Sequence, residues 1–589
     1  MTTWQERQRK VLLQTANQAW GQPLLTSGFW THGDIRNNYY LASYLIAAVA
    51  DSEYELPFNR DQAMAKASDV MTRVLLLQDK DPLSATYGHW PLGLGENPVD
   101  AQKNTLPAEI MGCLLAYCYK RYRSIMPDSL CDVVEQSLEV LYRGTYYRKL
   151  QRTFGHHEAK YTASKLIFGQ RFGDQQLLEI GFLDLERTLD RVREFGMPEY
   201  GALPWFWHWI QAYTSAYECL PSGEVRSRVA ELLDELWNYR AVYYLSGAWS
   251  GGRMRSLSHD LPRDGNVAFD YVQFGDFELP DRLPRVEYAG LLFHQAPDEA
   301  MATALHRHEP RETKRIITSA LGQDTPGLHS YLYAEKSYAA GGIWERVNEF
   351  DNEQHRWEIT FPLFTDGSVN HLYVLPPGKG YTEGDPRHAS ECGEVLFHKG
   401  TIIALYPTKN VESQELVGVL PLGEWVQEQG SIYGRVHDVY ISLFTQGTLQ
   451  LTEETDRLTI LCEGISNGIV VDAISDEEAG KRSITSLADF VHVMELRKPE
   501  WKVANLANAE RLPILENLPN LVKSENLSYI DYSRGIPNLP NSSNTGVSYE
   551  SFSGDRLWME ISLGIGRPAR LINGSPVDFE NYSTPGQSS

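Results

Sequence analysis

The sequence lacks several patterns that define whole classes of protein. Its six cysteines are widely spaced and form no CxxC pair, so we expect free, buried thiols rather than a disulfide framework or a zinc knuckle. No run of about 18 apolar residues occurs, so no membrane-spanning helix is predicted. No HExxH motif or similar paired-ligand spacing is present, and we therefore expect neither a metal nor a cofactor.

Positive charge is also scarce. Lys and Arg number 54 against 77 Asp and Glu, which gives a formal net charge of −23, and the cations form no runs. A surface that tracks phosphates needs clustered Lys and Arg, so nucleic acid is excluded as a partner. An acidic substrate is not excluded, because a local pocket of Arg, His and Lys can bind a carboxylate within an acidic protein.

The first residues are typical of an amphipathic helix and not of a signal peptide, since residues 1–20 contain no continuous apolar stretch and no small-residue cleavage site. We therefore expect a cytoplasmic protein. A secreted or periplasmic location would require that a leader had been removed.

Apolar and aromatic residues are plentiful. Hydrophobic residues make up 42% of the chain, with 14 Trp and 32 Tyr, which is typical of a globular protein. Flat amphipathic rings can stack on the apolar faces of sugars, although they also simply fill cores, and both interpretations stay open. At 589 residues the chain is long enough for two or three domains.

The N-terminal half carries helical periodicity. From Trp4 to about Tyr244, apolar residues recur at helical spacing between Gly, Pro and Asp. Several helices are apolar on more than one face, and short loops favour antiparallel pairs, so we expect concentric layers of helical hairpins. The clearest predicted helices are Asn37–Asp51, Leu106–Tyr122, Ser129–Tyr142, His157–Phe172, Leu177–Arg193 and Pro204–Cys219.

The pattern changes after about Leu279. Short β-branched or aromatic segments bounded by turn formers predict an antiparallel β-domain, and we expect a sandwich. A helix is expected at residues 312–322 (ETKRIITSALG), and an irregular tail with strands is expected beyond Pro499. The predicted domains are residues 1–279, 280–499 and 500–589. The predicted strands lie within residues 331–347, 355–364, 371–378, 393–407, 437–444, 447–454, 457–464 and 556–566.

A histidine pair stands where one of the helices should begin. His156 and His157 follow Gly155 and precede an apolar stripe. A helix start carries unpaired N–H groups and a partial positive charge, which favours the neutral imidazole, a form able to accept a proton. The alternative is a local cap or a satisfied core network.

Two further stretches hold candidate functional groups. Glu199 and Tyr200 lie in a turn before an aromatic helix, where a positive neighbour could lower the pKa of the phenol and suit it to proton transfer. Arg387 and His388 stand in a polar loop before a strand, and an Arg there could pair with a carboxylate. The alternative for the second stretch is an ordinary surface loop.

The aromatic helix after Tyr200 contains three tryptophans at alternate positions. Trp205, Trp207 and Trp209 cannot all face one way on a helix, so we expect some of them in the core and one beside a cleft.

The order of these patterns, together with the all-α half before the β half, resembles the heparinase II/III-like polysaccharide lyases and their alginate-lyase relatives. Three local patterns are similar to motifs of that family. They are the His156-His157 helix ending in Arg171-Phe172-Gly173, the turn Met197-Pro198-Glu199-Tyr200, and His388 followed by Leu396 and Gly400.

The motifs also depart from the family. His156 stands where the family has Asn, Met197 where it has Ser, and Ser390 where it has Asp. The resemblance covers most of the chain as architecture but only short stretches as motif. It implies a multidomain α + β protein, in which an (α/α) toroid, an incomplete barrel of helical hairpins, precedes an antiparallel β-sandwich.

The resemblance implies a polysaccharide lyase, an enzyme that cleaves a uronic-acid-containing glycan by β-elimination. Tyr200 and His388 would then transfer protons, while His156, His157 and Arg387 would neutralise the uronate carboxylate. Further residues expected to line the same cleft are Asn104, Glu199, His89, Trp90, Arg36 and Trp205. For Asn104, the N-cap of its helix is the competing interpretation.

Two other functions stay open. A glycoside hydrolase on the same scaffold would use paired carboxylates, for which Glu96, Glu158 and Glu199 are candidates. The other alternative is a non-catalytic glycan-binding protein. The sequence names neither the sugar nor the linkage, and it leaves a homo-oligomer open.

Overall fold

The computed structural model describes residues 2–197, 203–251, 253–254, 261–307, 309–317, 327–345, 354–377, 393–406, 414–428, 430–464, 467–502, 544–562 and 568–583. These residues form two compact units. Unit 1 holds the described residues up to 373 together with 579–583, and unit 2 holds those from 374 to 578. Strands β6 to β10 thus belong with the helices, while the division into three domains stays a prediction.

Unit 1 is built mainly from helices, as the periodicity predicts. All six helices singled out from the sequence are confirmed, and their ends agree within about two residues. The helices described in this unit are α1 (Trp4–Gly21), α2 (Ile35–Ala50), α3 (Arg60–Leu76), α4 (Thr105–Tyr122), α5 (Asp128–Arg143), α6 (His156–Phe172), α7 (Gln175–Phe195), α8 (Leu203–Cys219), α9 (Glu224–Val242), α10 (Ala268–Gln273) and α11 (Asp298–Leu305).

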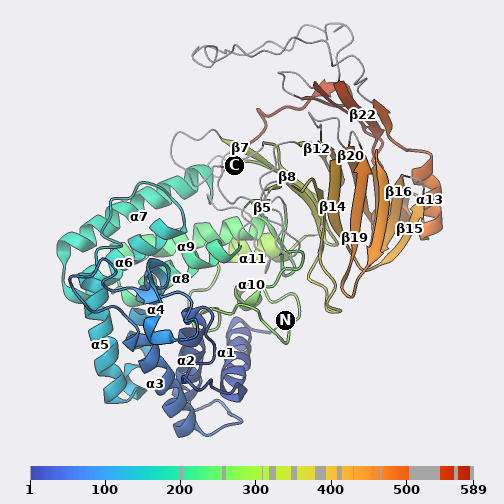
Figure 1. The fold of residues 1–589 in the computed structure, drawn as a ribbon. Helices are drawn as coiled ribbons and strands as arrows, with labels where there is room; N and C mark the ends of the chain where they lie inside the picture. The colour runs from blue at the N-terminus through green and yellow to red at the C-terminus, as the bar shows by residue number, and fades with distance from the viewer. Residues whose placement is uncertain are drawn as a thin grey trace. The chain divides into compact units, whose positions relative to one another are not determined.

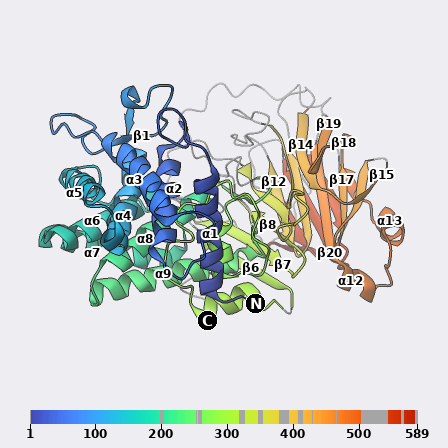
Figure 2. The ribbon, with the colours of Figure 1, turned by 90° about the horizontal axis from the view of Figure 1, so that it is seen from below.

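Helix α4 is central to this unit. It packs against α2, α5, α6 and α8, and α6 also packs against α7 and α8. Figures 1 and 2 show these helices side by side. Nearly every residue of α4 from Pro107 to Tyr119 is buried, which explains why its apolar residues cover more than one face. The concentric (α/α) arrangement itself stays a prediction.

A close approach between α6 and α7 depends on glycine. A Cβ built on Gly169 would lie 2.7 Å from the backbone nitrogen of Leu178, and one on Gly181 would lie 2.9 Å from the Cβ of Lys165. Real Cβ atoms essentially never show contacts this short, so the two helices can touch here only because both positions lack a side chain. This contact fixes the helix that begins at His156.

Gly169→Ala is therefore expected to lower the free energy of unfolding by about 1–3 kcal/mol, since the added methyl group must push α7 away from α6. Chemical denaturation measures the change. Gly21→Ala is the matched control, because this glycine ends α1 and has nothing within 4 Å of the added Cβ. Equal stability of the two variants would contradict the packing argument.

Five strands that begin in unit 1 pair in sequence order as antiparallel neighbours. The ladder runs β6 to β7, β7 to β8, β8 to β10, and β10 to β11. These strands are β6 (Arg311–Ile317), β7 (Leu328–Ala334), β8 (Ala339–Ile343), β10 (Trp357–Thr360) and β11 (His371–Leu375). Shorter strands of the unit are β1 (Trp90–Pro91), β2 (Lys103–Asn104), β3 (Tyr244–Leu245), β4 (Ala248–Trp249), β5 (Arg253–Met254) and β9 (Gln354–His355).

Strand β6 corrects a prediction. The helix expected from residue 312 is wrong up to Ile317, where the chain is a strand paired along its whole length with β7. Backbone hydrogen bonds to a neighbouring strand outweigh the helical propensity of Lys and Arg, because tertiary context overrides propensity. The remaining residues of the predicted helix, 318–322, lie outside the described residues.

Unit 2 consists of antiparallel sheets, which confirms the β character expected for this part of the chain. One sheet has the order β12-β13-β20-β17-β16-β15, another has β21-β22-β23-β24-β25, and β19 pairs with both β14 and β18. Figure 1 shows these strands side by side, with helix α13 (Leu487–Glu495) beside β16. A sandwich stays a prediction.

The strands of unit 2 have these bounds: β12 (Glu394–His398), β13 (Thr401–Tyr406), β14 (Gln414–Pro421), β15 (Glu424–Glu428), β16 (Ser431–Val436), β17 (Val439–Thr445), β18 (Thr448–Glu453), β19 (Arg457–Gly464), β20 (Asn467–Ser475), β21 (Glu500–Lys502), β22 (Asn544–Glu550), β23 (Arg556–Ser562), β24 (Ala569–Ile572) and β25 (Ser575–Pro576). A short helix, α12 (Asp476–Lys481), follows β20.

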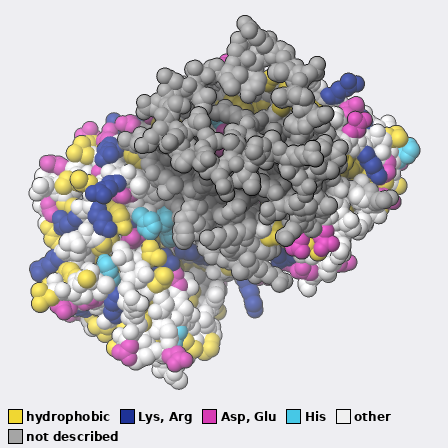
Figure 3. Space-filling view, turned by 45° about the horizontal axis from the view of Figure 1, so that its top comes forward, with side chains coloured by type: hydrophobic (Ala, Val, Ile, Leu, Met, Phe, Trp, Pro, Cys, Tyr) yellow, Lys and Arg dark blue, Asp and Glu magenta, His cyan; other side chains and the backbone are white. Residues whose placement is uncertain are grey.

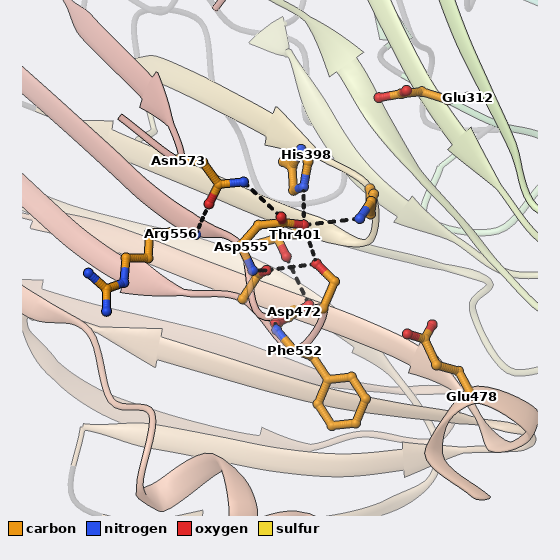
Figure 4. Close-up of polar contacts among 12 residues, drawn as sticks. Glu312, His398, Thr401, Asp472, Glu478, Phe552, Asp555, Arg556 and Asn573 are labelled. Atoms are coloured by element: carbon orange, nitrogen blue, oxygen red, sulfur yellow. Dashed lines mark hydrogen bonds and ion pairs between the residues drawn. The ribbon is translucent and has the colours of Figure 1, made fainter. Parts of the chain in front are cut away.

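The turn between β22 and β23 is tied to the sheet by Asp555 (Figure 4). Its Oδ2 atom accepts from His398 Nε2 at 2.7 Å, Lys399 Nζ at 3.0 Å and Ser553 Oγ at 2.7 Å, and Asn573 binds its Oδ1 atom. Burial alone would raise the pKa of Asp555, but these hydrogen bonds hold it well below its usual range. Ser553 donates to the carboxylate and not to the imidazole, so the group is not arranged as an activated nucleophile.

Asp472 anchors the same turn from the interior of the six-stranded sheet. Its carboxylate accepts from Thr401 Oγ1 at 2.9 Å, Tyr549 OH at 3.1 Å and the Phe552 backbone nitrogen at 2.6 Å. Burial raises the pKa of Asp472 to about 6. Asp555 therefore fastens the C-terminal strands to the end of β12, and Asp472 fastens them to β13 and β20.

Two absences concern only the part of the chain that the structure describes. No helix there is long and apolar enough to cross a membrane. The cysteines described, Cys113, Cys118, Cys131, Cys219 and Cys462, are free thiols, as predicted.

Candidate functional site

The histidine pair begins helix α6, as the sequence predicts. Gly155 is the N-cap, and His156 and His157 are the first two residues of the helix. Only 5% of His156 is exposed, because its ring stacks on Trp205 with centroids 4.6 Å apart and planes 8° from parallel. The ring of His208 lies 5.8 Å from that of His156. Three flat rings from α6 and α8 therefore lie together.

Glu109 of α4 faces the second histidine. Its Oε2 atom contacts His157 Nδ1 at 2.7 Å and Lys160 Nζ at 2.6 Å, and its Oε1 atom accepts from Tyr161 OH at 2.8 Å. Burial alone would raise the pKa of Glu109, but the charge of Lys160 and the hydrogen bond of His157 outweigh it and lower the pKa to about 2. The carboxylate is therefore ionised at neutral pH.

The members of this cluster differ sharply in exposure. The side chains of Glu109 and Lys160 are 3% and 2% exposed, whereas that of His157 is 44% exposed. The imidazole therefore bridges a buried carboxylate and the solvent. Figure 3 shows histidine side chains at the surface of the helical part of the molecule.

A second polar group lies within electrostatic range of the first. Burial lowers the pKa of His208 well below its usual value, and the charges of Lys160 and Arg285 lower it further, so this imidazole is neutral. Its Nδ1 atom and the hydroxyl of Tyr40 are buried without a hydrogen-bond partner. A bound water or ligand would satisfy both atoms.

The arginines near Tyr40 are each paired with a carboxylate. Arg36 Nε lies 2.9 Å from both oxygens of Asp34, and Arg285 Nε lies 2.5 Å from Glu287 Oε1. The predicted residue Arg36 thus lies among the charges that act on His208, but its guanidinium already has an acidic partner.

Other predicted binding residues are placed in different ways. His89 is half-buried with Nδ1 3.4 Å from Thr105 Oγ1, and the charge of Glu109 acts on it. Burial lowers the pKa of His89. Trp90 does not line a cleft as predicted. It is fully buried and its indole donates to the Val74 carbonyl, so it is a core residue.

Asn104 is the N-cap of α4, which confirms that interpretation of its role. Its side-chain oxygen accepts from the Leu106 nitrogen at 2.8 Å. It also borders a polar hollow of about 560 Å³ at the start of α4, the helix that carries Glu109. The hollow is lined by Leu92, Gly93, Leu94, Gly95, Asn97, Asp100, Ala101, Gln102, Lys103 and Asn104.

The three tryptophans of α8 divide between buried and partly exposed positions, and the cleft expected beside one of them stays a prediction. Trp207 and Trp209 are at most 1% exposed and belong to the core, whereas Trp205 is half-buried beside His156. The predictions for Tyr200, Glu199, Arg387 and His388 concern residues that lie outside the described residues.

Glu109, Lys160 and Tyr161 are not among the functional residues predicted from the sequence. A single acidic residue within the apolar stretch LPAEIMGCLLAY is the signal that points to Glu109, because a lone carboxylate on a buried helix needs a partner. A second cluster was also not predicted. In it, His371 Nε2 lies 2.5 Å from Asp264 and His371 Nδ1 lies 3.5 Å from Glu358. All three of these side chains are fully buried, so the cluster offers no surface to a substrate.

The arrangement around His157 suits recognition of an anion or transfer of a proton. It offers an accessible imidazole held by an ionised carboxylate, a buried lysine that balances that carboxylate, and an aromatic face nearby. Among the residues described, no group of three or more His, Cys, Asp or Glu side chains is placed to hold a metal ion.

Comparisons with known proteins gave structural likenesses only. No protein-family model and no curated protein matches the chain. A heparinase III is similar, with 10% identity, 90% of this chain and 82% of that chain covered, and a TM-score of 0.42. A chondroitinase AC lyase, whose complexes with oligosaccharides are known, has 9% identity, 97% and 93% coverage, and a TM-score of 0.42. The Streptomyces coelicolor A3 chondroitin AC lyase bound to chondroitin sulphate has 11% identity, 96% and 86% coverage, and a TM-score of 0.46.

Proposed function

We propose that this protein is a lyase that cleaves a uronic-acid-containing polysaccharide or oligosaccharide by β-elimination. The observation that carries the proposal is the accessible imidazole of His157, held by ionised Glu109 at the start of α6, where the family resemblance puts a substrate-binding helix. The half-buried ring of Trp205 nearby gives a sugar a flat face on which to stack.

In this reaction, a base removes the proton on the carbon beside the uronate carboxylate. The electron pair forms a carbon–carbon double bond, the glycosidic carbon–oxygen bond breaks, and the departing oxygen takes up a proton. The proton removed is only weakly acidic, so charge on the carboxylate must be neutralised as the transition state forms. His157 and Arg387 would neutralise it, and Tyr200 and His388 would transfer the protons.

His156 has a different role in the proposal. Its ring is almost wholly buried between α6 and Trp205, so it supports the aromatic face and the ring of His157, whose centroid is 4.0 Å away. In the proposal, His157, the more exposed of the pair, binds the substrate.

One observation favours the hydrolase alternative. Burial raises the pKa of Glu158, and a raised pKa is what a general acid of a glycoside hydrolase requires. Its carboxylate also accepts hydrogen bonds from the backbone of Arg152 and Thr153, which gives it a structural task in the loop before α6.

The test is an ultraviolet screen of acidic glycans with the purified protein. Elimination leaves an unsaturated uronate that absorbs in the ultraviolet, whereas hydrolysis releases reducing ends without that absorbance. Tyr200→Phe and His388→Ala are each expected to lower the elimination rate by about 10²–10⁴-fold, because each removes a proton-transfer group.

His492→Ala is the matched control, since this histidine is exposed on α13 of unit 2. Unchanged rates in both Tyr200→Phe and His388→Ala would remove the proposed acid and base. Reducing ends without ultraviolet absorbance would favour the hydrolase.

A further inference from the structure

We infer that Glu109 is a positioning residue for His157: its carboxylate keeps the proton on Nδ1 and leaves Nε2 as the only ring nitrogen available to a substrate carboxylate. This inference rests on the proposed function for its catalytic consequence. The state of the imidazole itself can be measured without any substrate.

The geometry supplies the first step. Nδ1 of His157 lies 2.7 Å from Glu109 Oε2. A carboxylate that is ionised can only accept hydrogen bonds, so the proton in this contact must belong to Nδ1. The pKa of Glu109, lowered to about 2, keeps the carboxylate ionised across the neutral range. Nδ1 therefore carries a proton whether the imidazole is neutral or charged.

Charge compensation does not account for the contact. Lys160 already balances Glu109 at 2.6 Å, and both side chains are buried between α4 and α6. The imidazole adds a further hydrogen bond to a carboxylate whose charge is already balanced, and the ring that makes this bond is 44% exposed. The contact also costs side-chain entropy, because it holds an exposed ring in one orientation.

The consequence is a fixed tautomer. Free neutral histidine favours the proton on Nε2, whereas the carboxylate selects the form with the proton on Nδ1. Nε2, at the opposite edge of the ring, is then a lone-pair acceptor in the neutral form and a donor in the charged form. A carboxylate that orients an imidazole through Nδ1 can change a reaction rate by orders of magnitude without contacting the substrate.

The experiment compares two double variants by histidine-selective ¹⁵N NMR. Glu109→Leu/Lys160→Met removes the acceptor together with its lysine, so no unpaired charge is left buried. Lys165→Met/Asp184→Leu is the matched control on the same helix. It removes a buried pair with a 2.5 Å contact between Lys165 Nζ and Asp184 Oδ2 that does not touch His157.

In the wild type, neutral His157 is expected to carry its proton on Nδ1. In Glu109→Leu/Lys160→Met, the proton should move to Nε2, while the control variant should keep the wild-type tautomer. With a glycan that the wild type cleaves, kcat should fall by about 10²-fold or more in the first variant and stay near wild type in the control.

Three results would overturn the inference: a wild-type His157 protonated on Nε2, the same tautomer in both double variants, or an equal loss of kcat in both. The wild-type spectrum tests the predicted tautomer of His157 even if a variant fails to fold. A protein that cleaves no glycan but shows the expected tautomers would refute the proposed function and leave the positioning role intact.

Discussion

Replacing His157 with alanine is expected to lower kcat/KM for glycan elimination by about 10²–10³-fold. The imidazole is the accessible member of the cluster on α6, and its loss takes away the group that, in its charged form, would donate through Nε2 to the substrate carboxylate as negative charge develops. The effect should appear mainly in kcat, because this charge is greatest in the transition state and not in the bound substrate. Initial rates followed by ultraviolet absorbance measure it.

The same substitution should barely change stability. The side chain is 44% exposed, and Glu109 keeps Lys160 and Tyr161 as partners when the imidazole is removed. The free energy of unfolding is therefore expected to change by less than about 1 kcal/mol. A variant that loses activity and stability together would indicate that His157 serves the fold, and a fully active variant would exclude it from the site.

The helices of unit 1 could be predicted because their signal is local. Apolar residues at helical spacing, a capping residue such as Asn104 and a glycine such as Gly173 at the end of α6 all lie within a few turns of one another. Strand β6 could not be predicted in this way. Its structure is decided by β7, which supplies hydrogen bonds from another part of the chain.

The candidate site, too, could be predicted only where its signal is local. The start of α6 at the histidine pair follows from the sequence, but the partner of His157 lies 48 residues earlier, on a helix that looked like plain core. Trp90 illustrates the opposite error: an aromatic residue in a glycine-rich loop suggested a cleft, whereas its ring fills the core next to Val74. Burial and long-range pairing depend on packing that one sequence does not encode locally.

A second large effect is expected at Arg240, which is fully buried on α9. Its Nη2 atom lies 2.7 Å from Asp270 Oδ2 on α10, and it also donates to the carbonyls of Tyr243 and Ala248. Arg240→Met leaves a carboxylate in the core without its cation. Removing one partner of a buried pair is strongly destabilising, so we expect the free energy of unfolding to fall by about 3–5 kcal/mol in chemical denaturation at neutral pH.

The loss should depend on pH in a definite direction. Burial raises the pKa of Asp270 to about 6 even with Arg240 present, against 3.8 ordinarily. The folded protein therefore binds a proton that the unfolded chain releases at a lower pH, and stability falls as pH rises from about 4 to 6. Without Arg240 the pKa of Asp270 rises further, so the penalty of Arg240→Met should be smallest near pH 4 and grow towards neutrality. Arg240→Met/Asp270→Leu, which removes both charges, should recover most of the stability and lose this pH dependence. If instead the double variant were as unstable as the single one at every pH, the loss of stability would come from the hydrogen bonds of Arg240 to the Tyr243 and Ala248 carbonyls and not from its pairing with Asp270.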